Sequence, residues 1–219
     1  FLSRLLDVLI FLGSLIPAWA IGVVAGNVLV GFPVDKSGYP VPDIFGYFNP
    51  FALFSGCVSI IVFVLHGLMW LNLKLSGEAL AHIRKSLGFV WALAAAFLLA
   101  AALWGAAGVT RAGGTVQAIP GLVVVVLGLV GTLVFFRGGK AGLGFVSRKL
   151  TIVGAVAAAA LSLFPVVIPS KLDPANNITI ASSAVTDSSL TVMLIIALIG
   201  VPLVAVYVIL LYRTFRKAA

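Results

Sequence analysis

The sequence predicts an all-α, polytopic membrane protein with six transmembrane helices, forming a single transmembrane domain over residues 1–219. Six stretches each hold about the 20 apolar residues that are needed to cross the hydrocarbon core of a bilayer. They are residues 8–30, 51–73, 87–109, 118–136, 150–168 and 190–212. Because these stretches lack the polar–apolar alternation of barrel strands, we expect helices. Hydrophobic residues make up 62% of the chain and charged residues 9%, with a mean hydropathy of +1.24, which excludes a water-soluble domain.

Small residues indicate which of these helices pack against protein. The first stretch contains Gly22 and Gly26 in a G-x-x-x-G pattern, and alanines are concentrated at 94–107 in the third and 155–160 in the fifth. Small side chains let helix backbones approach closely, so these three helices are expected to make protein contacts. The run 122–134 is instead rich in Val and Leu and is expected to face lipid.

Basic residues are distributed unevenly between the two sides of the membrane. The connecting segments 31–49, 110–117 and 169–189 carry only Lys36, Arg111 and Lys171 and are therefore assigned to the outside. The opposite side holds Arg4, Lys74, Arg84, Lys85, Arg137, Lys140, Arg148, Lys149, Arg213, Arg216 and Lys217. The positive-inside rule then places both ends of the chain in the cytoplasm. Topology and anionic lipid explain these basic clusters better than nucleic acid does.

The sequence offers few residues for chemistry inside the membrane. All six acidic residues are expected at or outside the membrane edges, namely Asp7, Asp35, Asp43, Glu78, Asp173 and Asp187. Cys57 is the only cysteine, and no nucleotide-binding, hydrolase or metalloprotease motif is present. We therefore predict no catalytic residue and no metal ligand in this chain.

His66 is the one ionisable candidate within a predicted span. A histidine at this depth could ligate haem, donate a hydrogen bond to a quinone carbonyl, contact lipid or a subunit interface, or belong to a proton path. The only other histidine, His82, is expected in a cytoplasmic loop, so no matching axial ligand is evident. A structural, hydrogen-bonded histidine is the favoured interpretation.

Several blocks of the sequence resemble subunit II of the cytochrome bd-type quinol oxidases. In order they are IFLGSLIP at 10–17, GNVLVGFP at 26–33, NPFAL at 49–53, HG at 66–67, LK at 73–74, GE at 77–78, FPVVIPS at 164–170, NITI at 177–180, SSLTVM at 188–193, VP at 201–202 and FRK at 215–217. The middle of the chain, 87–161, matches only in hydropathy. The resemblance therefore covers both ends of the chain in the family order.

The resemblance implies a nine-helix family fold built from two four-helix bundles and a peripheral helix. The six predicted spans correspond to its last six helices, or one and a half bundles. We therefore expect that the first three helices precede Phe1, which is not a methionine.

The resemblance also implies a function. This chain is expected to be a non-haem, structural part of a quinol:oxygen oxidoreductase in a prokaryotic plasma membrane, with no cofactor of its own. Haems b and d and the quinol oxidation site would belong to subunit I. The expected partners are subunit I, a small single-helix subunit, membrane lipids and a bound quinone, with no nucleic acid.

A six-helix transporter or permease domain is the alternative. Six glycine-rich spans are ordinary in such proteins, but broken helices and repeated halves would be expected there, and the sequence shows neither.

Overall fold

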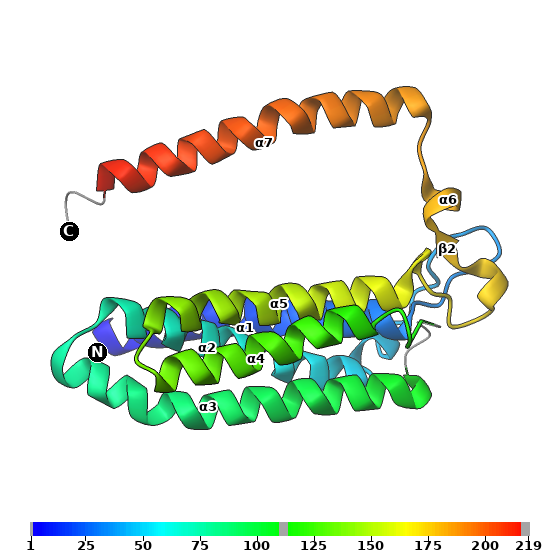
Figure 1. Ribbon diagram of the computed structural model, residues 1–219. Helices are drawn as coiled ribbons and strands as arrows, with labels where there is room; N and C mark the ends of the chain where they lie inside the picture. Colours follow the sequence, from blue (N-terminus) through cyan, green and yellow to red (C-terminus); the bar gives the residue numbers. More distant parts are fainter. Residues whose placement is uncertain (1, 110–113, 216–219) are drawn as a thin grey trace. The chain divides into compact units, whose positions relative to one another are not determined.

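The computed structural model describes residues 2–109 and 114–215 (Figure 1). The chain separates into two compact units, Phe1–Thr179 and Ile180–Ala219. The first unit contains α1 (Leu2–Val30), α2 (Pro50–Lys74), α3 (Gly77–Trp104), α4 (Ile119–Arg137), α5 (Ala141–Leu163), the strands β1 (Val166–Ile168) and β2 (Ile178–Thr179), and short 3₁₀ or π turns at Gly46–Phe48, Gly105–Val109 and Pro174–Asn176. The second unit contains α6 (Ile180–Ser183) and α7 (Asp187–Phe215).

Six helices among the described residues are long and apolar enough to cross a membrane, namely α1 to α5 and α7. This confirms the all-α, polytopic class that hydropathy predicts. The proposed single domain over 1–219 stays a prediction. Arg111, Arg216 and Lys217, which contribute to the predicted charge asymmetry, lie outside the described residues.

α3 and α5 begin furthest before the stretches that hydropathy marks. α3 begins at Gly77, so His82 lies in a helix and not in a loop as expected. α5 begins at Ala141, nine residues before the predicted span, because Arg148 and Lys149 interrupt the apolar run without ending the helix. α5 ends at Leu163 because Pro165 has no N–H to donate and disfavours helical backbone at Phe164. The apolar residues that follow form β1, which pairs antiparallel with β2.

The G-x-x-x-G pattern of α1 forms the contact with α2. A Cβ atom built on Gly26 would lie 2.7 Å from the Cα atom of Ala52, and one on Gly22 would clash with the backbone oxygen of Ser55. α2 itself starts at Pro50, and the N-cap Asn49 accepts a hydrogen bond from the Ala52 N–H at 3.0 Å. The expected close approach of α1 to another helix is therefore observed, and the structure identifies α2 as its partner.

The expectation that α4 faces lipid is wrong for one of its faces. Gly121, Val125, Gly128, Leu129 and Thr132 are buried. A Cβ atom on Gly128 would lie 2.5 Å from the backbone nitrogen of Thr151, so the backbones of α4 and α5 are in contact there. The mean hydropathy of residues 122–134 does not distinguish the two faces of the helix. The buried face contains glycines, which add little to that mean.

α3 is less buried than its alanine content predicts. Only Leu87 and Ala94 are buried in this helix, and alanines such as Ala96 and Ala100 are exposed in the structure. Small side chains permit close packing but do not require it, so an alanine-rich helix need not be enclosed.

The segments that follow α1 and α5 are joined to each other. The Phe32 N–H donates to the Pro169 carbonyl at 2.9 Å, and the Lys171 N–H donates to the Phe32 carbonyl at 2.8 Å. Asn27 donates to the Tyr47 carbonyl at 2.7 Å and accepts from Asn49 at 2.9 Å. These bonds fix the proline- and aromatic-rich segment 31–49 against the helix ends.

Candidate functional site

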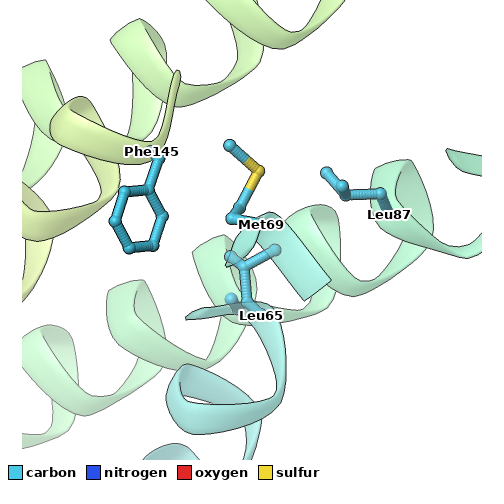
Figure 2. Packing of buried hydrophobic residues seen from close by; sticks show 5 residues of the cluster. Leu65, Met69, Leu87 and Phe145 are labelled. Atoms are coloured by element: carbon cyan, nitrogen blue, oxygen red, sulfur yellow. The ribbon is translucent and has the colours of Figure 1, made fainter. Parts of the chain in front are cut away.

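The surroundings of His66 are built on a small apolar core. Leu65 and Met69 of α2, Leu87 of α3 and Phe145 of α5 are buried against one another (Figure 2). This cluster sets the distance between α2 and α5 at the level where His66 lies.

The His66 ring lies beside this core and is half-buried. Its centroid is 5.0 Å from that of Phe145, with 34° between the ring planes. The buried Nδ1 atom makes no hydrogen bond to any residue that the structure describes. The hydrogen-bonded structural role that we favour from the sequence stays a prediction.

Arg148 differs most from the expected position. We expected it in a cytoplasmic loop, but it is the eighth residue of α5, and 0% of its surface is exposed. Its Nη2 atom donates to the Val62 carbonyl of α2 at 3.0 Å. Nε and Nη1 are buried and have no hydrogen-bond partner within the described part of the chain. A hydropathy window excludes such a residue because it counts the charge and cannot see which helix encloses it.

Arg148 and His66 belong to the same site. The Val62 carbonyl is the α-helical acceptor for the backbone N–H of His66, four residues further on. The Arg148 guanidinium therefore lies within one helical turn of His66. The adjacent Lys149 places its Nζ atom over the Phe145 ring, which also contacts the His66 ring. The site thus combines a buried cation, a half-buried imidazole and an exposed ammonium group.

Two aromatic rings and two lysines extend this site to the surface. The ring centroids of Trp70 and Phe145 are 5.4 Å apart. Lys74 Nζ lies 5.2 Å from the centroid of the Trp70 ring, and Lys149 Nζ lies 4.8 Å from that of Phe145. His66, Trp70 and Lys74 are spaced at four residues, which places them on one face of α2. We call these five residues, His66, Trp70, Lys74, Phe145 and Lys149, the basic aromatic patch.

Two further polar contacts between helices hold α3 in place. Arg84 Nε donates to the oxygen of the buried Asn72 side chain at 3.1 Å. Trp91 Nε1 donates to the Leu129 carbonyl at 3.0 Å. Both contacts fix α3 against its neighbours, so we interpret them as structural. The residues of the site itself come from α2 and α5.

An apolar cavity of about 270 Å³ lies between α1 to α5, away from His66. Its lining consists mainly of small and aliphatic side chains, with a few hydroxyl groups such as those of Ser55 and Ser162. His66 is not among the lining residues. The structure therefore does not join the histidine and the cavity into one site. Within 2–109 and 114–215, no three His, Cys, Asp or Glu side chains come together as a metal site would require.

Known proteins match this chain over nearly its whole length. The family model for cytochrome bd terminal oxidase subunit II matches residues 2–215. The cytochrome bd ubiquinol oxidase subunit 2 of Bacillus subtilis is 31% identical over 215 residues, which cover 96% of this chain and 63% of that protein. A probable cytochrome oxidase subunit 2 of Haemophilus influenzae is 28% identical, over 93% of this chain and 62% of the relative.

The cytochrome bd-I ubiquinol oxidase subunit 2 of Escherichia coli K12 is also 28% identical, over 90% of this chain and 61% of its own length. The chain thus spans slightly more than three fifths of the curated relatives it matches. The resemblance seen in the sequence blocks is confirmed, and the chain belongs to the cytochrome bd terminal oxidase subunit II family.

Proposed function

We propose that this chain is part of the non-haem subunit of a bd-type terminal oxidase, a complex that transfers electrons from membrane quinol to oxygen and forms water. The observation that supports this most strongly is the family match over residues 2–215. The relatives named as ubiquinol oxidase subunits point to the same reaction. A transporter is not favoured by these comparisons.

Within that complex we assign the chain a structural role. Haems b and d and the quinol oxidation site are assigned to a larger partner, subunit I. The close glycine contacts of α1 with α2 and of α4 with α5 support this role, because they form a rigid framework. Many large apolar side chains remain exposed on the outer faces of α1 and α5, where subunit I, a small single-helix subunit, a quinone or lipid tails would cover them.

The assembly is tested by purifying the full subunit, with an affinity tag, from its native membrane. We expect a larger subunit to co-purify, with haem b and haem d bands in the reduced-minus-oxidised spectrum and quinol-dependent oxygen uptake. The subunit expressed alone should show no haem spectrum. Stoichiometric haem on the subunit alone would contradict the structural role, and purification without any haem-bearing partner would contradict the oxidase assignment.

The orientation is also a proposal, and it places the α4–α5 turn and the end of α2 in the cytoplasm. It is supported by the basic residues around these segments. The test replaces Cys57 with Ala and introduces one cysteine at Lys140 or at Asp173. A membrane-impermeant maleimide applied to whole cells or spheroplasts should label the cysteine at 173 and not the one at 140. The reverse pattern would invert the assigned topology.

A further inference from the structure

We propose that the basic aromatic patch binds the phosphate headgroup of an anionic phospholipid. This inference does not depend on the oxidase assignment, because it rests only on contacts between α2 and α5.

The patch lies at the correct depth for a headgroup. Lys74 is the last residue of α2, and Phe145 and Lys149 lie within the first nine residues of α5. Trp70, which contacts Phe145, is 43% exposed. Tryptophan and lysine at the end of a spanning helix are typical of the interface between the hydrocarbon core and the headgroups. The two ammonium groups are therefore available at the level where lipid phosphates lie.

The charge at this end of the first unit is strongly positive. Its basic residues are Arg4, Lys74, Arg84, Lys85, Arg137, Lys140, Arg148 and Lys149, against Asp7 and Glu78. Asp35, Asp43 and Asp173 accept backbone hydrogen bonds in the loops at the opposite end. Basic pockets between spanning helices are a known mode of recognition for anionic headgroups.

The buried guanidinium gives this charge a specific position. Arg148 has two nitrogen atoms, Nε and Nη1, without an acceptor in the described part of the chain, and a buried cation without a counter-charge is costly. Its field is weakly screened because it is enclosed by α2 and α5. His66, one helical turn beyond Val62, is half-buried, and Lys149, the residue after Arg148, is exposed. An anion held at Lys149 would offset the charge of Arg148 without entering the protein.

The surroundings favour a lipid over a carboxylate of another protein chain. Val146 and Leu150, which flank Lys149 on α5, are 53% and 47% exposed. Phe63 and Leu73 on α2 are also exposed. Exposed apolar side chains on the same two helices as the ammonium groups suit a ligand that has a phosphate and acyl chains in one molecule. Each lysine keeps donors free for the phosphate, because a cation–π contact uses only one side of the ammonium group.

The test uses the purified complex in mild detergent, with added phosphatidylglycerol or phosphatidylcholine, and native mass spectrometry to count bound lipid. The variant is K74Q/K149Q, whose side chains are both exposed. Loss of two interfacial lysines should weaken phosphatidylglycerol binding about 30-fold. Phosphatidylcholine binding, which is expected to be weak, should not change. K74R/K149R should retain the binding.

The matched control is K85Q/K140Q, which removes the same number of exposed charges at the same end of the unit. It should bind phosphatidylglycerol as the unmodified protein does. Equal loss in both double variants would show only diffuse attraction and would overturn the site. Unchanged lipid binding in K74Q/K149Q would do the same. If this variant instead lost a protein subunit while lipid binding persisted, the patch would be a protein contact and the proposal would be wrong.

Discussion

α5 makes two helix contacts that are built on opposite principles. Toward α4 it presents small residues, and the two backbones touch through Gly121, Gly128 and Gly154. Toward α2 it presents Phe145 and Arg148, large side chains that reach across to Val62 and the His66 ring. α5 is buried on both of these faces. Substitutions should affect the two contacts differently. The contact with α4 has no space for a larger side chain, whereas the contact with α2 contains buried polar atoms without hydrogen-bond partners among the described residues.

The glycine contact should be the more sensitive of the two. Gly128→Ala places a Cβ atom 2.5 Å from the Thr151 nitrogen and 2.6 Å from its Oγ1 atom. The Thr151 backbone can move away only if α5 itself shifts, so we expect destabilisation of about 3 kcal/mol or loss of assembly. Thermal unfolding and yield of the complex measure this effect.

The control for this variant is Gly88→Ala on α3, where a Cβ atom would meet nothing within 4 Å. Alanine has a higher helix propensity than glycine, so this change should be neutral or stabilising by up to about 1 kcal/mol. Equal behaviour of the two variants would show that α4 and α5 are not in backbone contact.

The arginine contact should respond less, and its response should depend on the lipid. Arg148→Met removes the bond to the Val62 carbonyl, but it also removes two buried nitrogen atoms that have no acceptor among the described residues. These effects oppose each other, so in phosphatidylcholine nanodiscs we expect a net change within about 1 kcal/mol. In phosphatidylglycerol nanodiscs the unmodified protein should gain stability relative to the variant.

The measurement is thermal unfolding of both proteins in both lipids. A loss of several kcal/mol in phosphatidylcholine would show that the guanidinium is already fully compensated within the protein. Such a result would remove the contrast between the two faces of α5.

The smallest effect is expected at His66. His66→Gln keeps a donor and an acceptor at similar reach, so haem content should be unchanged and oxygen consumption should change by less than about twofold. An axial ligand would instead lose one haem band, since an amide is a poor substitute for imidazole nitrogen. A residue of a proton path would keep the haems but lose turnover with a shifted pH dependence, because glutamine does not titrate. Haem spectra and oxygen uptake on the same variant complex distinguish the three roles.

The sequence by itself determined the class of the protein. Six apolar stretches predict six helices because backbone groups in lipid must bond within their own segment, and this requirement does not depend on neighbouring helices. Gly22 and Gly26 also indicated a close-packing face on α1, since a G-x-x-x-G pattern acts through the shape of one helix, but the structure identified α2 as the partner. The blocks at both ends indicated the family for the same reason, as they can be recognised without any tertiary contact.

Only the tertiary structure decided which faces are buried and where the charges lie. Arg148 looks like a loop residue until α2 encloses it, and its acceptor, Val62, is 86 residues away in the chain. The buried face of α4 and the exposed alanines of α3 likewise depend on which helix stands beside them. Burial is a property of pairs of helices, and hydropathy describes each helix alone. The basic aromatic patch exists for this reason only in the folded chain, where α2 and α5 bring its five residues together.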